Sequence, residues 1–221
     1  MWRTEKGWTG LLTEYLTIAK PSEVVQIERK SKFIGYAQPV STVAEAEAFI
    51  AEICKKHWDA THNVYAYIIG INAEQQKCSD DGEPSGTAGL PVMEAIKAMH
   101  LVNVVVVVTR YFGGILLGRG GLIRAYGSAA KAALEAAVPV RYVPHQRVHI
   151  VVDYALAGKI QHELVRSEII IHKTIYMADV TFTVDILPEK TEQVYRKIQE
   201  LTADQFLWEL DTQVYHSLPV T

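Results

Sequence analysis

Residues 103–121 read NVVVVVTRYFGGILLGRGG, and this segment carries the clearest structural signal in the chain. Its five consecutive β-branched valines, Val104–Val108, are typical of a strand that is buried on both faces of a sheet, and we expect the strand to span 103–110. A glycine-rich turn, Gly113–Gly121, follows it. The alanine-rich sequence after the turn predicts a long helix that ends near Ala137 and packs closely on the sheet.

Upstream of this segment, the pattern predicts further strands and helices of the same domain. Alternating apolar residues indicate a hairpin, and Ser41 or Thr42 is placed to cap an amphipathic helix. A polar loop rich in turn formers then separates a strand from a second helix. The expected elements are strands at 24–28, 32–37 and 63–71, the helix after Thr42, the loop at 79–89 and a helix at 91–100.

Downstream, Pro139 and Pro144 bracket a change in composition, and we place a domain boundary there. The remaining sequence predicts the order strand, helix, strand, strand, helix, strand, which points to a ferredoxin-like βαββαβ domain. These elements are expected at 148–152, 155–166, 169–173, 178–187, 188–201 and 206–215. The predicted organisation is therefore α+β with domains at 22–140 and 141–221. Residues 1–21 are expected to form a tail, or an edge element that uses Leu11, Leu12, Tyr15, Leu16 and Ile18.

Composition limits the classes of function. Apolar residues make up 49% of the chain and charged residues 21%, as in an ordinary globular protein. The net charge of −3 leaves no global basic field, so any contact with RNA must come from a local basic surface. No apolar run has the length of a signal peptide or of a membrane span, and we expect a soluble cytoplasmic protein.

Two segments carry the residue types of a candidate phosphate-binding or RNA-binding site. Glycines allow close approach of the backbone, and a glycine-rich turn that enters a helix presents free N–H groups to an anion. Arginine adds bidentate phosphate contacts. The candidate residues are Arg110, Gly113, Gly114, Gly118, Arg119, Gly120, Gly121 and Arg124, with His62, Asp80, Asp81, Glu83 and Ser85 in a polar loop lining the same site. Alternatively, the glycines only form tight turns and permit close packing, since neither a Walker motif nor a dinucleotide fingerprint is present.

The acidic loop leaves three interpretations open. Asp80, Asp81 and Glu83 could chelate a hard cation such as Mg²⁺. They could equally form a solvated turn with Asx-type backbone hydrogen bonds. A salt link from this loop to the arginines across the site is the third possibility.

Other catalytic or metal-binding sets are not supported by the residue spacing. Cys54, His57, His62 and Cys78 do not match the spacing of a zinc site, and the two cysteines make no disulfide framework. Ser85 and Ser128 lack a hydrolase elbow. His62 could serve as a general base, although a hydrogen-bonded structural histidine is favoured, and no nucleophile–base–orienter set can be assembled. The second domain offers only scattered candidates for RNA contact. We therefore expect no metal, no cofactor and no catalytic residue.

Several blocks of this sequence resemble the N-terminal domain of the IMPACT family. They are Lys30–Ile34, Asp59–Asn63 with Tyr65–Tyr67, Ser79–Gly89 and Val105–Gly114, in one order across residues 24–135. The remainder is similar to the C-terminal domain of bacterial YigZ-type members. Arg119 departs from the smaller residue that we expect in many relatives, and it adds a positive charge to the glycine-rich turn.

The resemblance to the YigZ/IMPACT family implies both a fold and a function. It implies a first domain like ribosomal-protein modules and domain IV of elongation factor G, and a second like the ferredoxin-like domain V of that factor. Eukaryotic relatives regulate translation by competing for a partner of a starvation-activated kinase, with an additional N-terminal domain that does not match this sequence. For bacterial members the resemblance suggests association with RNA or the ribosome.

Three functional hypotheses follow. We favour a regulatory factor, linked to translation through RNA or ribosome binding, over an enzyme. The alternatives are a metal-assisted enzyme acting on a phosphorylated small molecule, with Asp80, Asp81 and Glu83 holding the metal, and a protein–protein adaptor. The sequence does not fix the oligomeric state.

Overall fold

The computed structural model describes residues 13–220 and divides into two compact units. The first domain comprises residues 15–142 with 217–220, and the second comprises 143–216 with 13–14. The domain boundaries that we inferred from the sequence, 22–140 and 141–221, stay a prediction. Leu11 and Leu12, which we expected in an edge element, lie outside the described residues. Tyr15 to Ile18 form a short strand, β1 (Tyr15–Ile18), which pairs antiparallel with residues 139–142.

The first domain is built on a five-stranded antiparallel sheet in the order β2-β3-β6-β4-β5. Its strands are β2 (Ser22–Glu28), β3 (Ser31–Pro39), β4 (His62–Ile69), β5 (Gln75–Ser79) and β6 (Val104–Tyr111). The central strand, β6, confirms the prediction from the valine run. It begins one residue later than expected, because Asn103 has a positive φ of 55° and its Oδ1 accepts a hydrogen bond of 2.8 Å from the Gly70 N–H.

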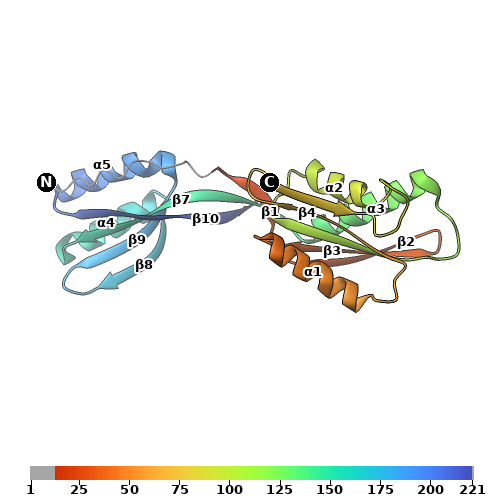
Figure 1. The fold of residues 1–221 in the computed structure, drawn as a ribbon. Coiled ribbons are helices and arrows are strands. Elements are labelled where there is room, and N and C mark those ends of the chain that lie inside the picture. Colours follow the sequence, from red (N-terminus) through yellow and green to blue (C-terminus); the bar gives the residue numbers. More distant parts are fainter. Residues whose placement is uncertain (1–12, 221) are drawn as a thin grey trace. The chain divides into compact units, whose positions relative to one another are not determined.

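Helices cover both faces of this sheet, which explains why the β6 valines do not alternate with polar residues. Val104, Val106 and Val108 belong to the core under α2 (Gly89–Ala98) and α3 (Gly118–Ala136). Val105 and Val107 belong to the core under α1 (Val43–Lys56), on the opposite face. Figure 1 shows α1 on one side of the sheet and α2 and α3 on the other. The expected cap of α1 is Thr42, whose Oγ1 accepts from the Glu45 N–H.

Two features of the first domain differ from the sequence-based expectation. β5 was not predicted, because its sequence QQKCS is polar and nearly all of it is exposed at the sheet edge. The glycine-rich turn is shorter than expected, since α3 already begins at Gly118. The alanine-rich packing of α3 is confirmed. A Cβ placed on Gly35 of β3 would lie 2.5 Å from the Ala129 carbonyl oxygen, so α3 touches the sheet backbone.

The second domain follows the predicted βαββαβ order. Its strands form the sequence β10-β7-β9-β8 across the sheet, the arrangement of a ferredoxin-like split βαβ unit. The α+β class with two domains is therefore confirmed. Its elements are β7 (Pro139–Val152), α4 (Tyr154–Arg166), β8 (Ile170–Tyr176), β9 (Val180–Ile186), the short 3₁₀ helix η1 (Pro188–Lys190), α5 (Thr191–Thr202) and β10 (Leu207–Pro219). No helix within residues 13–220 combines the length and the apolar character needed to cross a bilayer.

Substituting Gly158 by alanine should raise the stability of the chain. Gly158 lies exposed inside α4, and a Cβ there would meet no atom within 4 Å. Alanine removes the entropic cost of a helical glycine, so we expect a gain of about 0.5–1 kcal/mol in the free energy of unfolding, measured by urea denaturation. Gly118→Ala is the control, because that site is equally open but has φ of +71°. It should instead lose about 1–2 kcal/mol. Equal effects of the two substitutions would contradict the expectation.

Candidate functional site

The candidate site lies where β3 and β4 begin and β6 ends. Register places Arg110 of β6 beside Phe33 of β3 on one side and His62 of β4 on the other. The polar loop at residues 80–88 follows β5 and returns to the same end of the sheet. The antiparallel pairing therefore brings the loop and the strand ends together from four distant parts of the sequence.

Glu83 is the buried centre of this region. Its Oε1 accepts a hydrogen bond from Arg110 Nη1 at 2.5 Å and another from the Tyr126 hydroxyl at 2.8 Å. His62 Nε2 lies 3.8 Å from the same oxygen. The side chains of Glu83 and Arg110 are only 4% and 6% exposed, so the ion pair is shielded from water. Burial, reinforced by the negative charge of Glu83, raises the pKa of Tyr126, which keeps its hydroxyl protonated as a donor.

The Arg110 guanidinium is enclosed by aromatic rings. It lies 5.5 Å from the ring centroid of Phe33 and 5.4 Å from that of Phe112. Nη2 reaches Ser31 Oγ at 3.4 Å, and Nε is buried without a hydrogen-bond partner. Arg110, which the sequence analysis placed among the phosphate-binding residues, is thus turned inward and neutralised by Glu83.

The acidic loop is organised by its own backbone. Asp80 accepts hydrogen bonds from the N–H groups of Gly86, Ala88 and Gly89 at 2.9, 3.1 and 2.8 Å, and so it caps the start of α2. Burial acts to raise the pKa of Asp80, but these three donors outweigh it and lower the pKa. Asp81 Oδ2 accepts from the Asn63 N–H at 2.6 Å.

Of the three interpretations of this loop, the backbone turn and the salt link describe what is seen. Within residues 13–220, no three metal-ligating side chains are placed to share an ion. The Nδ1 atom of His62 lies 2.6 Å from the carbonyl oxygen of Asp81, and the carbonyl oxygen of Ser85 accepts a hydrogen bond from Arg119 at 3.3 Å.

His57 lies outside this loop. It is held between the hydroxyls of Tyr36 and Tyr111 at 2.7 and 2.9 Å, and burial lowers its pKa.

The glycines differ in what they do. A Cβ on Gly113 would overlap the backbone of Lys30 and Ser31, so this glycine permits contact between the β6–α3 loop and the β2–β3 turn. Gly114 and Gly118 have φ of 80° and 71°, the left-handed region that favours glycine. Gly120 and Gly121 lie in the first turn of α3, which has neither an acidic residue nor a capping side chain.

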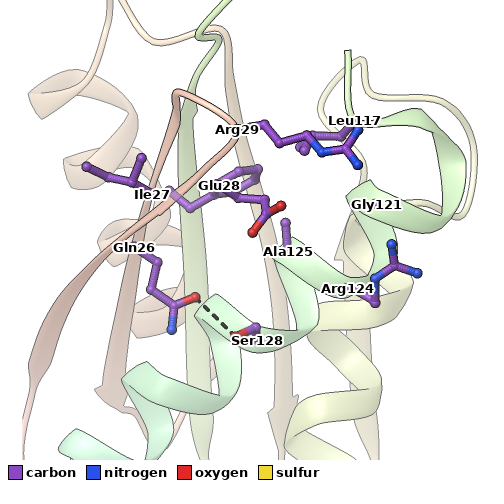
Figure 2. Close-up of a pocket in the computed structure, with 10 residues that line it drawn as sticks. Gln26, Ile27, Glu28, Arg29, Leu117, Gly121, Arg124, Ala125 and Ser128 are labelled. Atoms are coloured by element: carbon purple, nitrogen blue, oxygen red, sulfur yellow. Dashed lines mark hydrogen bonds between the residues drawn. The ribbon is translucent and has the colours of Figure 1, made fainter. Parts of the chain in front are cut away.

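Beside this turn, the β2–β3 hairpin and α3 enclose a pocket of about 270 Å³ (Figure 2). Arg29 and Arg124 line it, and neither guanidinium has a charged or hydrogen-bonding partner among residues 13–220. Arg119 is also exposed, with its Nη2 on the Ser85 carbonyl. The pocket is lined by Gln26, Ile27, Glu28, Arg29, Phe33, Leu117, Gly121, Arg124, Ala125 and Ser128.

Sequence reasoning found Gly121 and Arg124 of this pocket but missed the hairpin side. It also missed two exposed aromatic side chains, Phe112 in the β6–α3 loop, 45% exposed, and Trp58 in the loop that follows α1, 84% exposed. The Phe112 N–H donates to Thr61 Oγ1 at 3.0 Å, which ties the β6–α3 loop to the loop before β4. A lone exposed tryptophan next to a predicted helix end is a signal that could have been used.

With this geometry established, similarity to known proteins identifies the family. Residues 29–134 match the model of the Impact N-terminal domain, and residues 150–205 match that of a domain of unknown function, DUF1949. The chain is 42% identical to the IMPACT family member YvyE of Bacillus subtilis, over 87% of this chain and 88% of that protein. The chain belongs to the IMPACT family.

Other IMPACT family proteins show how far the similarity extends. The Escherichia coli member YigZ is 31% identical over 86% of this chain and 95% of its own length. The human protein IMPACT is 38% identical over 96 residues, which cover 41% of this chain and 29% of that protein. A crystal structure titled as that of a hypothetical protein is 30% identical and matches 91% of this chain and 99% of its own, with a TM-score of 0.59.

Proposed function

We propose that this IMPACT family chain is a cytoplasmic factor, linked to translation, that binds RNA or the ribosome through its first domain. The binding surface is the basic rim, which we define as Arg29, Lys30, Arg119 and Arg124. All four side chains are exposed, and two of them flank the pocket without an ionic partner. This pair of unpaired guanidiniums is the observation that carries the proposal, because arginine without a protein counter-charge is suited to bind phosphate.

The surroundings of the basic rim favour RNA over a simple anion. Exposed Phe112, in the β6–α3 loop that leads to Arg119, offers a ring on which an unpaired base can stack. The net charge of −3 means that binding depends on this local surface. Sites of this kind contact single-stranded or looped RNA, as found on ribosomal particles. Arg110 supports the surface from beneath without contacting the ligand.

Reversing the charge of Arg119 and Arg124 together should weaken RNA binding and flatten its salt dependence. Loss of two phosphate contacts should lower affinity by at least about tenfold and reduce the slope of log K against log salt by about 1.5. Fluorescence anisotropy with a labelled single-stranded oligonucleotide measures both. The control is Lys97→Glu with Lys131→Glu, which makes the same charge change within exposed pairs of α2 and α3. Equal losses in the two double variants would argue against the basic rim.

Sedimentation in a sucrose gradient tests the link to translation. Comigration of the tagged protein with ribosomal particles, lost at high salt and in the Arg119→Glu, Arg124→Glu variant, is the expected result. A protein that stays at the top of every gradient, with or without ribonuclease, would contradict the ribosomal part of the proposal.

A protein partner is the second candidate, favoured by the exposed apolar residues of the β6–α3 loop. Leu116 is 82% exposed and Ile115 is 40% exposed. Adjacent exposed apolar side chains often mark a contact with another protein. Co-purification of one partner that resists ribonuclease and is lost in Leu116→Ser would support an adaptor role.

A further inference from the structure

The pocket beside α3 has more chemistry than phosphate binding requires. Its inner wall is apolar, formed by Phe33, Leu117 and Ala125. Its mouth carries polar groups from both sides, and Figure 2 shows Gln26 and Glu28 on the hairpin facing Ala125 and Ser128 on the helix. Flat apolar faces with a hydrogen-bonding edge are the properties of a nucleobase.

We propose that this pocket accepts one unstacked RNA base, with a preference for guanine, while the flanking phosphates lie on Arg29 and Arg124. The inference rests on the proposed RNA binding and names the ligand of the same surface. The volume of about 270 Å³ lies below the range of about 300–1,000 Å³ typical of sites that enclose a drug-sized molecule. It therefore suits a single base whose sugar and phosphates stay outside.

The preference for guanine follows from Glu28. Its carboxylate lies at the pocket, has no ionic partner among the described residues, and can only accept hydrogen bonds. Guanine presents two adjacent donors, N1–H and the N2 amino group, which two carboxylate oxygens can accept together. Uracil places carbonyl oxygens on both sides of its single N–H, and these would be repelled. Adenine and cytosine each present an amino group beside a ring nitrogen that only accepts.

Gln26 completes the pattern. The hydroxyl of Ser128 donates to Gln26 Oε1 at 3.1 Å, which fixes the orientation of the amide. Gln26 Nε2 is then left as a donor without a partner among residues 13–220. A free donor next to an acceptor-only carboxylate matches the O6, N1–H and N2 edge of guanine. The dashed line in Figure 2 marks the hydrogen bond that sets this arrangement.

The test compares binding of two oligonucleotides, oligouridine and the same chain with one central guanosine, to wild type and to Glu28→Gln. Wild type should prefer the guanosine oligonucleotide by about tenfold, within the discrimination of one bidentate pair. Glu28→Gln should reduce this preference to less than about twofold, because the amide keeps one acceptor oxygen and replaces the other with an NH₂ donor that would face the N–H groups of guanine. Its affinity for oligouridine should stay the same or rise, since a negative charge next to the phosphates is removed.

The outcomes separate this inference from the proposed function. If Glu28→Gln strengthens binding of both oligonucleotides equally, Glu28 is only a rim charge and the guanine pocket is overturned. Binding of both by wild type without preference also overturns it, while RNA binding stands. Wild type that binds neither oligonucleotide removes both proposals. Gln26→Met keeps the side-chain volume and removes the amide donor, so it tests the proposed contact to guanine O6 independently of Glu28. Thermal unfolding of each variant confirms that it is folded.

Discussion

Replacing Glu83 by leucine should lower the free energy of unfolding by about 3–5 kcal/mol, because Arg110 would stay buried without a counter-charge. The effect is expected to be large since both side chains of the pair are at least 94% shielded from solvent. Among residues 13–220, Glu83 is the carboxylate that pairs with Arg110, and Arg110 Nε already lacks a hydrogen-bond partner. Tyr126 would also lose the acceptor of its buried hydroxyl. Urea denaturation followed by circular dichroism measures the loss.

The matched comparison removes the whole polar set. Replacing Glu83 by leucine, Arg110 by methionine and Tyr126 by phenylalanine together should restore most of the stability. Well-packed apolar residues of similar volume often stabilise a buried site as much as an ion pair does. Glu23→Gln, which breaks the half-exposed pair between Glu23 and Lys56, should cost less than about 1 kcal/mol. A Glu83→Leu variant as stable as Glu23→Gln would contradict the burial of the pair.

Much of the first domain could be predicted from local patterns. The valine run of β6 indicates a strand covered on both faces, because five consecutive β-branched residues favour a strand and leave no polar alternation. β5 had no such signal, because its edge position leaves QQKCS exposed and its pairing partner, β4, is set by the fold and not by local sequence. Local sequence also could not choose among the three interpretations of the acidic loop. The choice depends on backbone N–H groups, such as that of Gly89, whose positions only the fold determines.

Only those parts of the candidate site that have a local sequence signal could be predicted. Arg119 lies within the glycine-rich segment Gly113–Gly121 and Arg124 follows it by three residues, so sequence proximity was enough to associate them with it. The inward turn of Arg110 could have been inferred from β6, since it shares the face of Val106 and Val108 that α3 covers. The pocket had no local signal, because its two sides are separated by about ninety residues of sequence and meet only when α3 packs on the hairpin. Arg29 and Glu28 were therefore missed.

The contact of Gly113 with the β2–β3 turn should be essential for RNA binding, because it holds Arg29 and Lys30 beside Arg119 and Arg124. In Gly113→Ala the added methyl group would meet the carbonyl group of Lys30 and the amide nitrogen of Ser31, which are backbone atoms held in the hairpin. The β6–α3 loop must then move away from the β2–β3 turn, and the hydrogen bond of 3.2 Å from the Gly113 N–H to Ser31 Oγ is lost. We expect a loss of about 1–3 kcal/mol in stability, as for overpacked sites. RNA affinity should fall by about tenfold, because Arg29 and Lys30 no longer face Arg119 and Arg124.

Gly114→Ala separates this effect from simple backbone strain. Gly114 has φ of 80°, but a Cβ there would meet nothing within 4 Å. Alanine should therefore cost about 1–2 kcal/mol of stability through its unfavourable conformation. It leaves the contact between the β6–α3 loop and the hairpin in place, so RNA affinity should change by less than about threefold. Denaturation and anisotropy on both variants give the comparison. If Gly113→Ala binds RNA as tightly as Gly114→Ala, the two halves of the basic rim act independently, and the pocket between them is not the RNA site.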